Sequence, residues 1–225
     1  MSTLQKLSLA LVGTAVVFMS ANPASAITLN TSSGIFSTEP GAVTVNFNTG
    51  VAPTNGFAQY SSPSGTPTVV AGTVPNQYAQ PLGDPTSYLT ISPVSSNVPG
   101  NTGSVTINFM QALDYFGLYW GSVDPYNSIA FFNGSTLLDT FTGNNVVNPS
   151  NGNQTSPQQN VFVNFFADPG QTFDKIVLSS TDIAFESDNH SYRVASVPEP
   201  TTTLGLLAFG VMSAGSFVKR KLKSV

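Results

Sequence analysis

Short alternating segments, separated by turn residues, are the feature that most restricts the fold of this chain. Away from its two ends, no segment repeats apolar residues with a helical period over ten residues. Apolar and polar residues instead alternate over short stretches, which is typical of half-buried β-strands, and Gly, Pro and Asn separate the stretches. This pattern predicts strands at 42–47, 88–91, 104–109, 115–120, 128–132, 135–141, 161–166, 173–178, 183–185 and 191–194.

Two of these segments carry further information. Residues 115–120 are dense in aromatic side chains, which predicts a strand buried on both faces. Asn133-Gly134 separates 128–132 from 135–141, and this dipeptide is the strongest short-range signal for a β-hairpin. Many short strands with Gly, Pro and Asn turns predict an all-β fold, an antiparallel β-sandwich of the jelly-roll kind.

The strand pattern is uneven along the predicted domain, which covers residues 27–197 and fits a single folding unit. Residues 27–103 are loop-rich, with 51–85 expected as long loops containing one or two short strands, whereas 104–196 contain regular strands. The chain has no cysteine. Its apolar core must therefore hold the domain without disulfides, and thiolate metal sites and cysteine nucleophiles are excluded.

The first 26 residues have the three parts of a secretory signal peptide. Lys6 supplies a positive charge, Leu7 to Met19 form an apolar stretch, and Ala24-Ser25-Ala26 form a small-residue cleavage site. We therefore predict that the protein is exported and that the mature chain begins at Ile27.

The C-terminal segment 198–225 also has three parts in a fixed order. Pro198-Glu199-Pro200 precede an uncharged apolar run, 201–218, and a basic tail, 219–225. As a helix, the 18 residues of the run would reach about 27 Å, close to the roughly 30 Å hydrocarbon core of a bilayer. Basic residues resist translocation, so the tail predicts a stop-transfer signal behind a transmembrane helix. Its basic residues are Lys219, Arg220, Lys221 and Lys223.

This ordered C-terminus resembles the PEP-CTERM sorting signal, the substrate tag of membrane-embedded exosortases. The resemblance implies an exosortase partner, processing near Pro198, Glu199 and Pro200, and delivery of the preceding domain to the cell surface. The alternative is an ordinary single-pass anchor with a Pro-rich linker.

Segments 115–122, 173–178 and 184–189 also resemble the ectodomain of a subgroup of PEP-CTERM surface proteins. That likeness implies a β-sandwich at the cell surface or in the extracellular matrix, without an assigned ligand or reaction.

The predicted domain is strongly acidic. Of the 11 Asp and Glu residues in the chain, ten lie from Glu39 to Asp188. Lys175 and Arg193 are the only basic residues of the predicted domain, so the domain is near −8 against −4 for the whole chain. A phosphate backbone repels such a surface, which excludes nucleic acid as a partner. Acidic polysaccharide is repelled as well, unless a divalent cation bridges the two.

Glu186, Asp188 and Asn189 place hard oxygen ligands close together at a predicted strand end. Calcium selects such ligands, so these three residues form a candidate weak calcium site. The alternative is an Asx-type turn, in which the side chains bind nearby backbone N–H groups. No other cofactor is expected. His190 follows in the same polar turn, and we interpret it as a solvated residue because no nucleophile motif accompanies it.

A second candidate site follows the aromatic strand. Trp120 and Tyr126 could form a platform for sugar rings, with Asp124 and Asn127 binding sugar hydroxyls. The alternative is a core strand that runs into a turn, with Trp120 buried. Paired carboxylates could also support hydrolysis, but no pair is singled out by the sequence.

Together these features predict an exported protein of the cell surface or extracellular matrix, sorted and processed by an exosortase, with a structural or adhesive role and no enzymatic activity. The alternative is a carbohydrate-binding module whose fold is supported by a weak calcium site.

Overall fold

The computed structural model describes residues 26–196. The predicted signal peptide, the Pro198-Glu199-Pro200 motif, the apolar run 201–218 and the basic tail lie outside the described residues. Within residues 26–196, no helix is long and apolar enough to cross a membrane.

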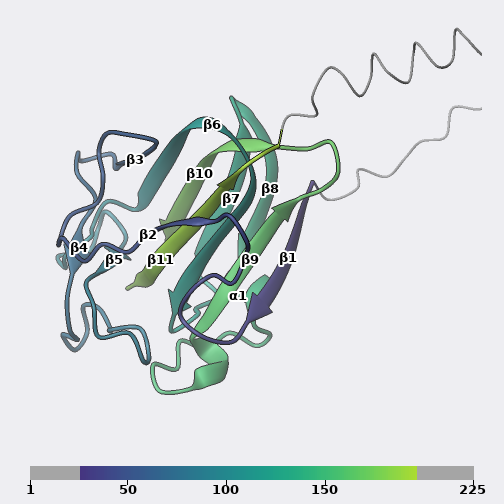
Figure 1. The fold of residues 1–225 in the computed structure, drawn as a ribbon. Coiled ribbons are helices and arrows are strands. Elements are labelled where there is room, and N and C mark those ends of the chain that lie inside the picture. The colour runs from purple at the N-terminus through teal and green to yellow at the C-terminus, as the bar shows by residue number, and fades with distance from the viewer. Residues whose placement is uncertain (1–25, 197–225) are drawn as a thin grey trace, which may run out of the picture.

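The domain is all-β, as predicted, and each strand pairing in the described part is antiparallel. Eleven strands join into one hydrogen-bonded sheet that folds over on itself (Figure 1). Two short helical segments, α1 (Gly143–Val146) and η1 (Pro157–Gln159), lie between strands. The strands are β1 (Ile27–Ser32), β2 (Val43–Val45), β3 (Ala58–Ser61), β4 (Val69–Val70), β5 (Tyr88–Ile91), β6 (Ser104–Gly121), β7 (Asn127–Asn133), β8 (Thr136–Thr142), β9 (Val161–Ala167), β10 (Phe173–Ser180) and β11 (Phe185–Val194).

Strand β6 is the element that belongs to both halves of the sheet. Its first part pairs with β3 and β10, and its second part pairs with β9 and β11. Between them the register to β10 shifts, and residues 110–112 are exposed. The segments 104–109 and 115–120, predicted as separate strands, are therefore one strand with a bend, because a bulge lets a strand pass from one layer to another.

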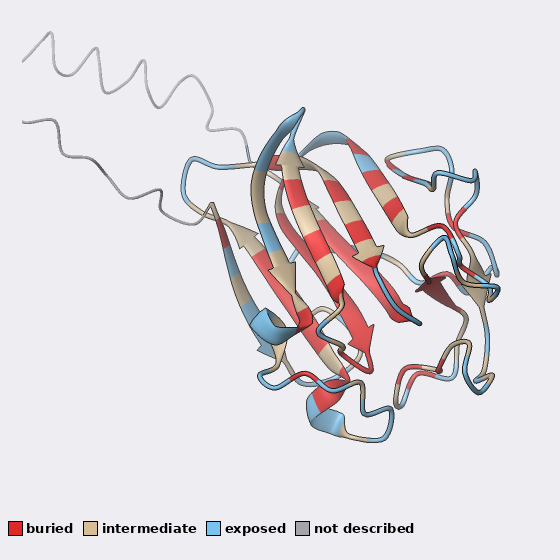
Figure 2. Cartoon of the chain, turned by 180° about the vertical axis from the view of Figure 1, so that it is seen from behind, coloured by how far each residue is buried: buried red, intermediate tan, exposed pale blue. Residues whose placement is uncertain are grey.

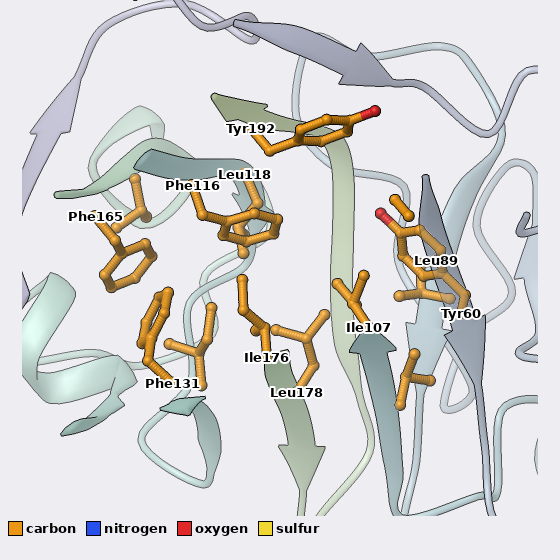
Figure 3. Close-up of a cluster of buried hydrophobic side chains, with 14 of the residues drawn as sticks. Tyr60, Leu89, Ile107, Phe116, Leu118, Phe131, Phe165, Ile176, Leu178 and Tyr192 are labelled. Atoms are coloured by element: carbon orange, nitrogen blue, oxygen red, sulfur yellow. The ribbon is translucent and has the colours of Figure 1, made fainter. Parts of the chain in front are cut away.

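The sheet forms two layers that meet across an aromatic core. One layer has the order β3-β6-β10-β7-β8, and the other has the order β1-β9-β6-β11, with β5 and β2 on the far edge of β11 and β4 beyond β5. The Phe131 ring of β7 lies 4.8 Å from the Phe165 ring of β9, measured between centroids. Figure 3 shows such side chains from both layers packed together.

The burial of each strand follows from what covers its faces. Strand β7 alternates between buried and partly exposed residues, because only one of its faces meets the core (Figure 2). Residues 115–121 of β6 and 185–192 of β11 are instead buried without interruption, which confirms the prediction for the aromatic strand. A long loop, residues 73–86, covers the outer face of this pair; we call it the strap. The Tyr119 hydroxyl on β6 donates to the Leu82 carbonyl of the strap.

Several local predictions are confirmed. Strands β7 and β8 form the predicted hairpin, with Gly134 at a left-handed φ of 57° in its loop. The 51–85 region contains two short strands, β3 and β4. Strand β1 was not predicted; it pairs with β9 along its whole length.

Candidate functional site

The polar run 186–191 lies in the middle of the sheet. The segments 183–185 and 191–194 were predicted as strands with a polar turn between them, but residues 185–194 form the single strand β11. Every residue from Glu186 to Ser191 is at most 2% exposed. The turn prediction was wrong because distant segments, chiefly the strap, provide hydrogen-bond partners that make burial of these polar groups tolerable.

His190 is likewise enclosed, which corrects its interpretation as a solvated residue. Its Nδ1 lies 3.0 Å from the Tyr60 hydroxyl, and its Nε2 lies 3.0 Å from the Ser187 hydroxyl. Burial lowers the pKa of His190 to about 3, so the ring stays neutral. The Ser187–His190 pair resembles part of a catalytic triad, but Tyr60 takes the place of a carboxylate and both residues are 0% exposed. A substrate cannot reach this pair in the packed domain.

Glu186 attaches the strap to β11 at one point. Its Oε1 accepts a hydrogen bond of 2.9 Å from the Ala79 N–H, and its Oε2 accepts one of 3.0 Å from the Ser122 hydroxyl. Burial, opposed by these hydrogen bonds, raises the pKa of Glu186 to about 7.

Asp188 attaches the strap at a second point. The Thr86 hydroxyl oxygen lies 2.9 Å from Asp188 Oδ2 and 2.6 Å from Asp84 Oδ1. A hydroxyl has only one hydrogen to donate, and both carboxyl groups are almost fully buried, so a proton on Asp188 would allow both contacts to be hydrogen bonds. Burial and the neighbouring Asp84 accordingly raise the pKa of Asp188 to about 8.

The predicted calcium ligands therefore do not share one set of contacts. Glu186 faces Ala79 and Ser122, Asp188 faces Thr86, and the Asn189 side-chain amide donates to Asp84 and to the Ile35 carbonyl. Among residues 26–196, no group of three or more His, Cys, Asp or Glu side chains is arranged to hold a metal ion. Calcium binding by Glu186, Asp188 and Asn189 stays a prediction.

A cavity of about 410 Å³ opens where the strap meets the N-terminal end of β11. Part of the strap, residues 73–79, forms one wall, and the segments after β6, before η1 and before β11 supply the rest. Its lining is rich in hydroxyl, amide and carboxyl groups: Thr73, Asn76, Gln77, Tyr78, Ser122, Asp124, Tyr126, Asn151, Gln154 and Glu186.

The structure brings one residue of the candidate calcium site and two of the candidate glycan site together in this pocket. Asp124 and Tyr126, predicted to contact a glycan, line it beside Glu186. Asn127 does not line it: its side chain is fully buried and binds the Ala184 carbonyl and the Ser180 hydroxyl. Asn127 is therefore a structural residue, which corrects its assignment as a glycan contact.

Trp120 is also a core residue, as the alternative interpretation of the aromatic segment predicted. Its ring is fully buried and stacks on Phe185 at 4.4 Å between centroids. The aromatic side chains that do line the pocket are Tyr78 and Tyr126.

Tyr126 links the pocket wall to the start of β11. Its hydroxyl oxygen lies 2.8 Å from Asp124 Oδ2 and 2.7 Å from the Ile183 carbonyl oxygen. The single hydroxyl hydrogen is shared between these two acceptors, which links the pocket wall to the segment before β11. Burial, the largest cause, raises the pKa of Asp124, and the hydrogen bond from Tyr126 opposes this rise.

The charge of the pocket limits what it can bind. Asp124 and Glu186 are its ionisable carboxyl groups, and its lining contains no Lys, Arg or His. Arg193 is instead paired with Asp114 and Glu39, and Lys175 lies over the Phe132 ring. The site can therefore exchange hydrogen bonds with an uncharged polar ligand, while it repels anions.

The strap residues of the site were missed by sequence reasoning. Asp84 and Thr86 flank a proline, and the 51–85 region was interpreted as long loops with one or two short strands. An aspartate before Pro is an ordinary turn signal, so nothing local distinguishes a strap that packs on a sheet from a solvated loop.

The fold and the pocket define an all-β domain with a polar cavity at one end of its sheet. The family comparison adds where this domain is sent: residues 196–221 match the PEP-CTERM protein-sorting motif, which confirms the resemblance of the C-terminus. The motif implies export, an exosortase partner, processing at the membrane and then a surface location. Neither the curated proteins nor the solved structures include a significant match to the chain.

Proposed function

We propose that this chain is an exported, exosortase-processed protein of the cell surface or extracellular matrix, with a structural or adhesive role and no enzymatic activity, and that its adhesive contact is the polar pocket. The PEP-CTERM motif at 196–221 supports the sorting part of the proposal. The convergence of Asp124, Tyr126 and Glu186 in one cavity supports the adhesive part.

The sorting part assigns Pro198, Glu199 and Pro200 to recognition. Two prolines remove two backbone N–H donors and disfavour a helix, so the chain can enter a protease cleft without first unfolding one. Glu199 is the only carboxylate side chain after Asp188, and a basic pocket of the enzyme could read it. The apolar run 201–218 would hold the precursor in the membrane, with Lys219, Arg220, Lys221 and Lys223 as the stop signal.

Glu199→Ala and Glu199→Gln are expected to slow processing about 10-fold or more, because a hydrogen bond to a charged group contributes about 1.5–3 kcal/mol. The measurement is the ratio of processed to unprocessed protein in the native host, with mass spectrometry of the mature C-terminus. Thr202→Ala is the control and should be processed normally. Wild-type processing of both Glu199 variants would refute this role.

The adhesive part assigns a neutral polysaccharide to the pocket. Its volume of about 410 Å³ lies in the range of ligand cavities, roughly 300–1,000 Å³. Carboxyl and amide groups offer donors and acceptors to sugar hydroxyls, and Tyr78 and Tyr126 offer aromatic surface beside them. The acidic charge of the domain favours an uncharged glycan over an acidic one.

Asp124→Ala and Gln154→Ala are expected to weaken binding of a neutral glycan about 10-fold or more, since each removes a polar partner from the pocket. A glycan array identifies the ligand, and titration with and without calcium measures its affinity. Asn48→Ala, an exposed substitution outside the pocket, is the control. Glycan binding that survives both pocket variants would place the adhesive site elsewhere. If the domain binds no neutral glycan, the adhesive part of the proposal is wrong and only the structural role remains.

A further inference from the structure

The pocket and the C-terminal end of the described domain lie at opposite ends of the sheet. Register pairs Glu186 with Gly121 at one end of β11, and Val194 with Leu113 at the other. Both ends of the described chain lie at this second end, where β1 begins and β11 finishes (Figure 1). We call it the terminal end; it also contains the β6 bend at 110–112, because the Ala195 N–H donates to the Ala112 carbonyl.

The length of β11 and the reach of the segment that follows it limit how the domain can be oriented on a membrane. From Glu186 to Val194, β11 spans about 25 Å at the rise of a β-strand. From Ala195 to Thr201, where the apolar run begins, the chain can span at most about 22 Å however it is arranged. Crossing the headgroup layer uses roughly 6 Å of this. About 16 Å remains, which is too short to hold the terminal end 25 Å above the surface with the pocket facing down.

We propose that in the membrane-anchored precursor the terminal end of the domain rests on the lipid surface and the pocket faces away from it. This inference rests on the proposed anchoring by residues 201–218. It goes beyond the proposed function because it assigns a lipid-facing surface and a direction to the pocket.

The side chains at the two ends suit these positions. Met110 in the β6 bend is 69% exposed and Val194 at the end of β11 is 40% exposed, so apolar side chains stand beside the point where the tether leaves. Exposed apolar side chains gain by contact with a lipid interface. The opposite end presents mainly the amides and carboxyls of the pocket, which gain nothing from such contact, together with one exposed apolar side chain, Ile183.

The absence of cysteine from the chain permits a direct test with single labels. Full-length precursor carrying Met110→Cys or Gln154→Cys is labelled with a fluorophore and reconstituted, without exosortase, in phosphatidylethanolamine–phosphatidylglycerol vesicles containing a headgroup-attached quencher. Both positions are exposed, and Gln154 lies on the pocket rim, so the two variants form a matched pair. Melting curves check that both remain folded.

The Met110 label is expected to be quenched several-fold more than the Gln154 label. A flexible insert of about 20 Gly and Ser residues after Ser196 is expected to reduce this difference, since it lengthens the tether beyond the height of the domain. Equal quenching of the two labels in bound precursor, or a difference that the insert leaves unchanged, overturns the orientation alone. Precursor that does not float with the vesicles overturns the proposed anchor, and the orientation with it.

Discussion

Phe131→Ala is expected to lower the free energy of unfolding by about 3–5 kcal/mol, because it opens a large cavity in the core. Phe131 is 0% exposed and belongs to β7. Its ring packs against four others, with centroid distances of 4.8 Å to Phe165, 5.0 Å to Phe173, 6.1 Å to Phe141 and 6.4 Å to Phe116. These rings come from both layers, so the cavity would open where the layers meet.

Chemical denaturation of the purified protein at constant pH measures this loss. Phe36→Ala removes the same ring from a position that is 57% exposed, so its effect should stay within about 0.5 kcal/mol. If Phe131→Ala cost no more than Phe36→Ala, the two layers would not share the core that Figure 3 shows.

The second prediction is that the domain loses about 2–3 kcal/mol of stability between pH 6.5 and pH 9, since each pKa unit corresponds to about 1.4 kcal/mol. The folded-state pKa values of Glu186, about 7, and Asp188, about 8, lie above the ordinary values of 4.5 and 3.8. A raised carboxyl pKa means that the folded state binds the proton more tightly. The stabilisation is therefore complete below the unfolded pKa and is lost as the pH rises through the folded pKa.

His190 acts in the opposite direction at lower pH. Its folded pKa of about 3 lies below the ordinary 6.5, so protonation of the unfolded chain lowers stability as the pH falls below 6.5. Stability should thus be highest in mildly acidic solution and decline on the alkaline side. No Lys or Arg side chain pairs with Asp84 or Asp188 in the described domain. Lys175 and Arg193, the only Lys and Arg between Ile27 and Ser196, instead contact Phe132, Tyr115, Glu39 and Asp114.

Asp188→Asn is expected to flatten the decline between pH 6.5 and pH 9, because an amide keeps a donor beside Thr86 and Asp84 without ionising. Thermal melts over the pH series measure it. Asp168→Asn, in a turn at the terminal end, should keep the wild-type profile. An unchanged alkaline decline in Asp188→Asn contradicts the assignment. If calcium restored the stability of the wild-type protein at pH 9, that result would instead support the predicted calcium site.

The strands that were predicted well are those specified by nearby residues. The β7–β8 hairpin needs only alternation and a two-residue turn, and the β5 segment 88–91 needs only its apolar alternation and flanking turn residues. The polar run of β11 was misjudged because its partners are remote in sequence. Glu186 binds Ala79, and Asp188 binds Thr86, each about a hundred positions away. Local pattern cannot tell a solvated turn from a buried strand whose polar groups are satisfied by a distant loop.

In the candidate site too, single residues could be found from the local sequence, but their arrangement depends on remote contacts. Asp124 and Tyr126 were found because carboxyl and aromatic residues after an aromatic strand suggest sugar binding, and Glu186 was found as a calcium ligand. That all three line one pocket could not be predicted, since it depends on the antiparallel pairing of Glu186 with Gly121 and on the strap that closes the wall. Asn127 was predicted to face a ligand, but its backbone position in β7 turns it towards Ala184 and Ser180.

By itself, the sequence determined the all-β class of this protein and its sorting signal. Strand alternation is a local property, and a sorting signal is read by another protein as a linear stretch, so neither depends on the rest of the fold. The tertiary structure alone decided which polar residues are buried, which face the pocket, and that the pocket lies at the end of the sheet opposite the one where β11 finishes. These features depend on contacts between segments that are far apart in the chain, and such contacts leave no periodic pattern in the sequence.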